Sequence, residues 1–206
     1  MSTTRDEVIA YELHGNCYLN ITSECTLRCA FCPKFNKTWE VQGYDLRLKH
    51  EPSFEQVVEA VGDVGRYKEI VFCGLGEPTE RLDLLLQLAT HFKAQGATIR
   101  INTDGLASLR EGRDVAPELA GRIDALSISM NAHTEELYNR HCRPKSEYPG
   151  AFNAMLDFAR QAKEYVPSVT LTAIDGLAGV DMDACRRIAE QEIGVKFRRR
   201  VLDMVG

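Results

Sequence analysis

The chain has 206 residues, 44% of them hydrophobic, and a formal net charge of −5. This length fits one domain over residues 1–206, whose folding buries roughly 70% of the unfolded surface. The charge gives no general basic field for nucleic acid or an anionic membrane, and no stretch approaches the roughly 18 apolar residues of a membrane span. The polar, charged start does not have the composition of a signal peptide.

Cysteine usage indicates the compartment. The chain has seven cysteines, an odd number, and three of them lie in one short stretch. This pattern suits a reducing cytosol better than a disulfide framework, so we expect a cytoplasmic protein. The other four cysteines are scattered singly, and a second metal cluster is not expected. They are Cys17, Cys73, Cys142 and Cys185.

A hairpin opens the predicted fold. Residues 8–13 and 17–22 have the composition of strands, and residues 14–16 form the turn between them. The second strand leads into the stretch that holds the three cysteines. Residues 34–51 then form a polar segment with weak periodicity, which either folds over the site as a lid or is a surface loop.

Strands and helices alternate from residue 53 onward. Ser53 and Gln56 predict a capping box at the start of a helix that ends near Gly65. The remaining strands are predicted over residues 69–73, 98–103, 124–130, 168–174 and 196–202, and the remaining helices over residues 81–95, 116–119, 134–141, 151–165 and 181–192.

This alternation predicts a parallel sheet whose strands are joined by right-handed crossovers. A complete eight-unit barrel typically needs about 250 residues, which leaves this chain about two units short. The predicted fold class is therefore α/β, a partial, laterally open (β/α)6 TIM-like barrel. A flavodoxin-like open sheet is the alternative.

Polar and apolar residues alternate along four of the predicted strands. On one of them, Ser127, Ser129 and Asn131 share a face, and the residues between them are apolar. Parallel strands that are covered on both sides normally read as continuous apolar runs, as residues 70–73 do. The alternation elsewhere predicts that one face of the sheet borders a polar lumen filled by a ligand.

Three cysteines follow the second predicted strand, at the end of a strand where α/β proteins build their sites: Cys25, Cys29 and Cys32. A cubane iron–sulfur cluster normally takes four thiolates, one per iron. Three local thiolates would leave one iron open, and an open coordination position is typical of a catalytic metal. The alternative is a zinc site with Cys17, Cys73 or a histidine as the fourth ligand, although zinc ribbons usually carry a second cysteine or histidine pair.

The spacing Cys-X3-Cys-X2-Cys, with Phe31 just before the last cysteine, resembles the signature of the radical S-adenosylmethionine (SAM) superfamily. Residues 18–32 look most similar to the small TatD-associated radical SAM proteins. The resemblance implies one [4Fe-4S] cluster whose open iron binds SAM, and a reductant such as flavodoxin or ferredoxin. Reductive cleavage of SAM would give a 5′-deoxyadenosyl radical that abstracts hydrogen from a substrate the sequence does not identify. Phe31 would lie against adenine, a contact worth about 1–3 kcal/mol by analogy with base stacking.

Other activities stay open at this point. Within the same family, the short chain also resembles 7-carboxy-7-deazaguanine synthase, and a glycyl-radical activating enzyme is another alternative. Outside it, a non-catalytic zinc or iron–sulfur module that binds a partner would need no SAM. Colour separates these classes, because a cubane protein is brown and a zinc protein is colourless.

A glycine-rich turn, GLGEP, occupies residues 74–78 at the end of the next strand. Glycines let the backbone approach a ligand closely, and exposed N–H and C=O groups there can bind its polar end. The turn resembles the Gly-Gly-Glu-Pro motif that holds the amino group of SAM, with Leu75 in place of the first glycine. By this resemblance, Gly76 and Glu77 lie close to the SAM ammonium or ribose.

Three more residues are predicted to contact the cofactor. Residues 102–105, NTDG, resemble the Thr-Asn-Gly turn near the SAM ribose, and lumen parity favours Asn102 as the contact. Ser129 and Asn131, on the polar face of the following strand, are placed for the ribose or the SAM carboxylate. Their alternative role is hydrogen bonding within the lumen.

Three isolated cysteines have structural interpretations. Cys142 lies in a basic run over residues 140–144, which could supply an activated thiol to the substrate but is more often a basic helix end. We therefore favour a structural role for this run. Cys73 and Cys185 are expected to fill the core, the commonest fate of a free cysteine.

The last predicted strand carries Arg198 and Arg200 on the face opposite Phe197 and Val201. By the pattern of the other strands, both arginines point into the lumen, where a guanidinium would bind a carboxylate or phosphate of the substrate. The alternative is a charged edge strand, because basic residues on an exposed edge deter pairing with other chains.

Overall fold

The computed structural model describes residues 7–36 and 38–201. The strands in that part of the chain are β1 (Ala10–Leu13), β2 (Asn16–Leu19), β3 (Glu40–Val41), β4 (Tyr44–Asp45), β5 (Ile70–Phe72), β6 (Ile99–Thr103), β7 (Ala125–Ser129), β8 (Ser168–Asp175) and β9 (Lys196–Val201). The α-helices are α1 (Phe54–Val61), α2 (Leu82–Ala94), α3 (Ala107–Glu111), α4 (Glu135–Cys142), α5 (Ala151–Ala162) and α6 (Met182–Arg187). Shorter turns are the 3₁₀ helices η1 (Val64–Arg66), η2 (Pro78–Arg81) and η3 (Ala116–Leu119) and the π-helical segment η4 (Ile188–Ile193).

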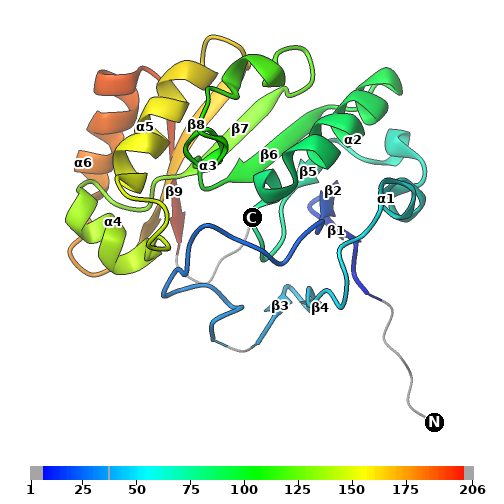
Figure 1. Ribbon diagram of the computed structural model, residues 1–206, viewed down its shortest axis with the longest axis horizontal. Helices are drawn as coiled ribbons and strands as arrows, with labels where there is room; N and C mark the ends of the chain where they lie inside the picture. The colour runs from blue at the N-terminus through cyan, green and yellow to red at the C-terminus, as the bar shows by residue number, and fades with distance from the viewer. Residues whose placement is uncertain (1–6, 37, 202–206) are drawn as a thin grey trace.

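Seven strands form the main sheet in the order β1-β2-β5-β6-β7-β8-β9. All neighbours in it are parallel except β1 and β2, which pair antiparallel. Figure 1 shows α1, α2, α3, α5 and α6 along one side of the sheet, and the segment that carries β3 and β4 along the other. In the described residues β1 and β9 are the two edges of this sheet, so it does not close. The predicted partial, laterally open barrel is confirmed.

The opening hairpin is confirmed, with a tight turn. Leu13 pairs with Asn16, so only His14 and Gly15 form the loop, and both have positive φ, 56° and 80°. This is the backbone that two-residue hairpins favour. Strand β2 ends at Leu19, before the predicted end at residue 22, because its parallel partner β5 ends at Phe72 opposite Leu19.

The capping box of α1 is also confirmed. The Ser53 hydroxyl accepts from the Gln56 N–H at 3.3 Å, and the Gln56 side chain accepts from the Ser53 N–H at 2.8 Å. The helix ends at Val61, earlier than predicted, because Gly62 has a φ of 64° and leaves the helical conformation. Asp63 then caps the short turn η1.

Other elements also differ from the prediction. Helix α3 lies where a loop was expected; it has only five residues and no side-chain cap, so the sequence carries little signal for it. The predicted last helix is α6 and then continues as the π-helical segment η4. Strand β9 was predicted to include Leu202, which lies outside the described residues.

The two faces of the sheet have different partners. The face toward the helices is apolar and forms the main core, with side chains such as Phe72, Ile101 and Ile128 fully buried. On the inner face, Val71 of β5 packs in a second, smaller cluster with Tyr18 and residues from β1 and the segment after the cysteines. The predicted alternation of apolar and polar residues therefore reflects the two faces of the sheet, because the apolar residues face the core and the polar residues face the cavity.

The segment over residues 34–51 covers this inner face. Its hairpin β3–β4 and the following Leu46 place Val41 and Leu46 against Tyr11 and Tyr18. We call residues 40–46 the strap. Of the two interpretations of this segment, a fold over the site agrees with the structure. Among the described residues, the helices lack the length and apolar content needed to cross a membrane.

A buried asparagine holds the strap in place. The side chain of Asn20, which is fully buried, donates to the carbonyl oxygens of Val8 and Leu46, both at 3.0 Å. A buried donor satisfies its hydrogen bonds at a net gain of about 0.5–1.5 kcal/mol each, and a lost partner costs about 1–3 kcal/mol. One side chain therefore ties the strap to β2 and to the chain before β1.

We predict that Asn20→Ala loosens the strap more than it loosens the sheet. Trypsin should cleave after Arg47 and Lys49 several times faster than in the wild type, because these sites follow directly on the released segment. Timed digestion read by mass spectrometry measures the rates, and Asn36→Ala, at an exposed position nearby, is the matched control. Equal cleavage rates in both variants would contradict the role of Asn20.

Candidate functional site

A cavity of about 420 Å³ lies at the carboxyl ends of the parallel strands and below the strap. Its lining includes every residue that the sequence predicts for the site: Cys25, Cys29, Phe31, Cys32, Gly76, Glu77, Asn102, Ser129, Asn131, Arg198 and Arg200. Residues up to about 175 positions apart in the chain thus meet in one space, as the rule for α/β sheets predicts. A second hollow, of about 580 Å³, lies around residues 163–169 and 190–196 and holds none of them.

The cysteine loop is held on one side by the end of α4. The N–H of Arg28 donates to the carbonyl oxygen of Cys142 at 3.1 Å, and that of Ala30 donates to His141 at 2.8 Å. Leu27 also forms a β-bridge with Pro144. The basic run that ends α4 is therefore a clamp for the loop, which agrees with the structural interpretation of this run.

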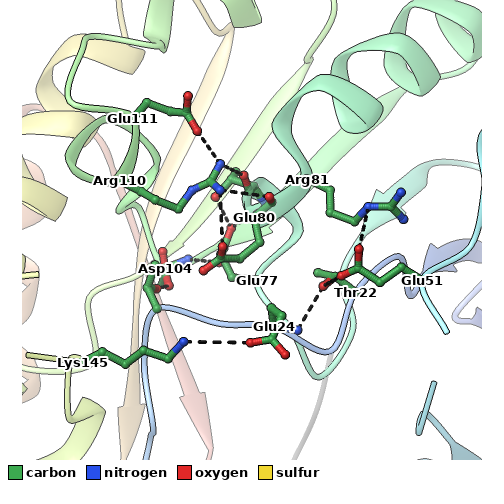
Figure 2. Close-up of polar contacts among 12 residues, drawn as sticks. Thr22, Glu24, Glu51, Glu77, Glu80, Arg81, Asp104, Arg110, Glu111 and Lys145 are labelled. Atoms are coloured by element: carbon green, nitrogen blue, oxygen red, sulfur yellow. Dashed lines mark hydrogen bonds and ion pairs between the residues drawn. The ribbon is translucent and has the colours of Figure 1, made fainter. Parts of the chain in front are cut away.

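The other side of the loop rests on the turns that follow β5 and β6. The N–H of Glu77 donates to the carbonyl oxygen of Glu24 at 2.8 Å, and the Thr26 hydroxyl donates to the Asp104 carboxylate. Figure 2 shows Glu77 and Asp104 side by side next to the loop, with Glu24 near them. Hydrogen bonds from three separate connections thus fix the position of the cysteines.

Gly76 is where the loop and the turn approach each other most closely. A Cβ atom at this position would lie 2.6 Å from the carbonyl oxygen of Glu24 and still closer to that of Thr22. Both neighbours are backbone atoms, so they cannot rotate away. The glycine predicted from the GLGEP turn is therefore required for packing against the cysteine loop, whatever contact it makes with a ligand.

Glu77 is a buried carboxylate whose two oxygens both accept hydrogen bonds. One oxygen accepts from the Thr79 N–H at 3.1 Å and from the hydroxyls of Thr79 and Thr103 at 2.7 Å. The other accepts from the Asp104 N–H at 2.7 Å. Burial nevertheless raises the pKa of Glu77, and burial together with Glu77 raises the pKa of Asp104 well above its ordinary value. Glu77 thus shapes the turn over residues 103–105 in addition to lining the cavity.

The surroundings of the three loop thiols raise the pKa of each of them. Burial and the nearby carboxylates of Asp104 and Glu77 raise the pKa of Cys25, and burial raises that of Cys32. For Cys29 the largest cause of the raised pKa is a hydrogen bond with Cys142, followed by burial. Because a metal binds the thiolate, loading of this site must release protons.

The three loop cysteines are arranged better for an iron–sulfur cluster than for a single metal ion. Within residues 7–36 and 38–201, no three His, Cys, Asp or Glu side chains are close enough together to hold one metal ion. A cubane makes a different demand, because each thiolate binds its own iron and the three sulfur atoms stand apart. All three cysteines are free and line the cavity, and Phe31 lies beside them in the lining.

The polar residues of the strands face the cavity as predicted. Asn102 accepts from the Arg100 guanidinium at 2.8 Å, and Asn131 accepts from Arg200 at 3.0 Å. Ser129 also lines the cavity. Asn131 has a φ of 57° and donates toward the sulfur of Cys142 at 3.7 Å, so it connects β9 to the clamp on the cysteine loop.

One cysteine was wrongly interpreted. Cys73 was expected to fill the core, but it lines the cavity, where burial raises its pKa and the neighbouring Asn102 side chain lowers it. It is the residue after β5, where the strand turns toward the site, so its side chain belongs to the inner face. Cys185 is fully buried in the main core, as predicted.

Sequence reasoning also missed part of the lining. Asp104, Tyr11 and Val41 border the cavity. Asp104 carried a signal, because it directly follows a strand and stands inside the NTDG turn. Tyr11 and Val41 carried none, since they reach the cavity only through the hairpin β1–β2 and the fold of the strap.

The model of the radical SAM superfamily matches residues 19–191 of this chain. The chain belongs to the radical SAM superfamily. Members of this family are enzymes that bind a [4Fe-4S] cluster and SAM and depend on a reductant, and this protein is a radical SAM enzyme. The narrower resemblance to the TatD-associated members stays a prediction.

A curated relative has 33% identity over 118 residues: the tungsten-containing aldehyde ferredoxin oxidoreductase cofactor-modifying protein of Pyrococcus furiosus. That match covers 55% of this chain and 30% of the relative, so the chain spans less than a third of the protein it matches. The relative's own activity therefore does not transfer with the match.

Solved structures of radical SAM enzymes share the fold at low identity. HydG, the FeFe-hydrogenase maturase of Carboxydothermus hydrogenoformans, has 16% identity and a TM-score of 0.65 over 91% of this chain and 44% of its own. TYW1 with a lysine-pyruvate adduct bound has 17% identity and a TM-score of 0.58, over 91% of this chain and 65% of its own. Methylornithine synthase (PylB) has 19% identity and a TM-score of 0.58, over 91% of this chain and 53% of its own. These likenesses support the partial barrel and say nothing of the substrate.

We predict that Gly76→Ala separates the cysteine loop from its support. A methyl group against two carbonyl oxygens forces a backbone shift that costs about 1–3 kcal/mol of unfolding free energy. Iron uptake on anaerobic reconstitution should fall with it, because the loop loses its fixed position. Gly65→Ala is the control, since its Cβ would meet only the Asp63 side chain, at 3.2 Å. Normal stability and iron content in Gly76→Ala would show that the contact does not matter.

Proposed function

We propose that this radical SAM enzyme holds one [4Fe-4S] cluster through Cys25, Cys29 and Cys32 and binds SAM in the adjoining cavity. The observation that supports this best is the shared cavity itself. Three free thiols, the Gly76 turn and the lumen-facing residues of β6 and β7 line one space of about 420 Å³, within the range of ligand pockets.

Each predicted residue has a role in this arrangement. Phe31, beside the last cysteine, offers an aromatic face for adenine. The turn at Gly76 brings backbone polar groups next to the loop, where they can meet the SAM ammonium. Asn102, Ser129 and Asn131 line the inner face, where they can meet the ribose hydroxyls and the SAM carboxylate.

A cluster held by these cysteines would supply the electron for reductive cleavage of SAM to methionine and a 5′-deoxyadenosyl radical, which would abstract hydrogen from the substrate. The residues of this chain bind and orient the two partners, and the strap shields them from water. The reductant that fits this chemistry is a small electron-transfer protein such as flavodoxin or ferredoxin. The substrate is unidentified.

We predict that replacing any one of the three loop cysteines by alanine removes most of the bound iron. Each cubane ligand holds a separate iron, so one missing thiolate destabilises the whole cluster. Iron and sulfide analysis after anaerobic reconstitution measures this, and a brown protein with broad visible absorption distinguishes a cluster from zinc.

Two matched controls sharpen this test. Cys73→Ala removes a thiol that lines the cavity but is not a proposed ligand, and Cys185→Ala removes one from the core. Both should keep their iron, as should Cys17→Ala and Cys142→Ala. Full cluster content in Cys29→Ala would sink the assignment.

We predict that SAM changes the paramagnetic resonance signal of the reduced cluster and that 5′-deoxyadenosine and methionine form slowly without substrate. In Glu77→Ala the Thr103 hydroxyl and the Asp104 N–H lose their acceptor, so the Kd for SAM should rise at least tenfold, about 1.4 kcal/mol. Glu80→Ala, which removes a neighbouring carboxylate paired with Arg110, is the control.

The cluster spectrum of Glu77→Ala should stay that of the wild type, because Glu77 is not a ligand. A reduced cluster whose signal does not respond to SAM would refute binding of SAM at the open iron. Equal SAM affinity in Glu77→Ala and Glu80→Ala would refute only the role of Glu77 and would leave the binding of SAM at the cluster untouched.

A further inference from the structure

Two arginines enter the cavity from β9. Arg198 donates to the Ser127 hydroxyl at 3.2 Å, and Arg200 donates to the Asn131 side chain at 3.0 Å. Arg199, between them, points to the other side of the strand and pairs with Asp175. The predicted parity of β9 is confirmed, so these two side chains are part of the cavity wall and do not lie along the outer side of the edge.

Neither cavity arginine has an acidic partner among the described residues. The third arginine of the lumen, Arg100, is neutralised by Glu69 at 3.0 Å. Glu77 and Asp104 also line the cavity, but their oxygens are engaged by the turns that they support. The guanidinium groups of Arg198 and Arg200 therefore leave the wall of the cavity positively charged.

The arginines also have unused hydrogen-bonding capacity. The Nε of Arg200 is buried and has no hydrogen-bond partner in the described structure. The hydrogen bonds of Arg198 to Ser127 and of Arg200 to Asn131 each use one Nη2 atom and a neutral acceptor. A guanidinium has five N–H donors in a planar fork, and a buried donor without a partner destabilises the fold. An oxyanion would satisfy both the charge and the open donors.

The burial of the two arginines and the repulsion between their charges also favour a bound anion. Burial lowers the pKa of both arginines, and each has a neighbouring arginine that lowers it further, Arg100 for Arg198 and Arg198 for Arg200. Two cations held together in a half-enclosed space are unfavourable without an anion. The structure keeps them there by the strand register, which fixes Thr172 opposite Arg198 and Ile174 opposite Arg200.

The wall next to the arginines is aromatic. The rings of Tyr11 and Tyr18 stack with their centroids 5.3 Å apart, and both residues line the cavity together with Val41 and Leu75. Aromatic and aliphatic side chains favour a ligand with a flat apolar body. The cavity thus offers an anion site and an apolar surface close to each other.

We propose that Arg198 and Arg200 form a subsite for an oxyanion of the substrate, a carboxylate or a phosphate, carried on a small body with an apolar face. As a substrate subsite this rests on the proposed function. The fork of Arg200 binds the anion with its Nε and a terminal nitrogen, and Arg198 adds the second charge. Ser127 and Asn131 hold the two guanidinium groups in place from β7 and the residues after it.

The test is a titration of the anaerobically reconstituted full chain with three small probes: benzoate, phenyl phosphate and benzamide. They share a flat ring and differ in the group that it carries. Calorimetry with and without saturating SAM gives the Kd values. We expect both anions to bind and the neutral amide not to bind, and the tighter anion identifies the preferred oxyanion.

Variants assign the binding to the two arginines. Arg198→Lys and Arg200→Lys keep the charge but lose the fork, so the Kd of the preferred anion should rise at least tenfold, about 1.4 kcal/mol. Arg199→Lys, whose side chain points away from the cavity, should bind like the wild type. Melting temperatures identify a variant that fails to fold, and the other arginine then carries the test.

Four results would overturn the subsite. Three of them are equal binding of benzamide, an equal loss in Arg199→Lys, and displacement of the anions by SAM, which would mean that the arginines hold the SAM carboxylate. Wild-type binding in both lysine variants would leave the arginines as protection of the β9 edge.

The two proposals fail separately. A protein that binds the anions but neither assembles a cluster nor cleaves SAM contradicts only the proposed function. Intact SAM cleavage without anion binding contradicts only the subsite. Once a substrate is known, Arg200→Lys should lower its stimulation of SAM cleavage at least tenfold relative to Arg199→Lys.

Discussion

The close approach of Gly76 to the carbonyl oxygens of Thr22 and Glu24 is the contact on which the site depends. It presses the turn after β5 against the cysteine loop, and the N–H of Glu77 then reaches the loop as a hydrogen-bond donor. A larger residue would push the two segments apart. The loop has no regular secondary structure of its own over most of its length, so its shape comes from these contacts and from the clamp at the end of α4.

Burial of Glu77 and Asp104 next to the cysteine loop costs free energy, but their hydrogen bonds fix the positions of the surrounding loops. Burial raises the pKa of both carboxylates, and the neighbouring Glu77 raises that of Asp104 further. Their hydrogen bonds, to Thr103, Thr79 and Thr26 among others, join the connections after β2, β5 and β6. Figure 2 shows the surrounding ion pairs, from Arg110 with Glu80 to Arg81 with Glu51, which enclose this network. Buried polar groups specify one arrangement when all of them are satisfied.

The inner face of the open sheet is covered by segments other than barrel strands. A closed barrel would cover the inner face with its remaining strands, whereas here the strap and the hairpin β1–β2 do so. The resulting cavity has hydrogen-bonded carboxylates under the cysteines and a cationic wall along β9. In the proposed function, a positively charged SAM would lie near the carboxylates and the arginines would remain for an anion.

The sequence by itself determined the features that depend on local spacing. The period of two along each strand predicted which side chains face the cavity, down to Arg198 and Arg200, because the pleat of a strand alternates its side chains. The cysteine spacing predicted the family, and Ser53 and Gln56 predicted the start of α1. Only the tertiary structure decided what depends on contacts between distant segments. The cavity position of Cys73, the contact of Cys142 with Cys29 and the packing of the strap on β2 all follow from how strands and loops far apart in the chain meet, which no local pattern records.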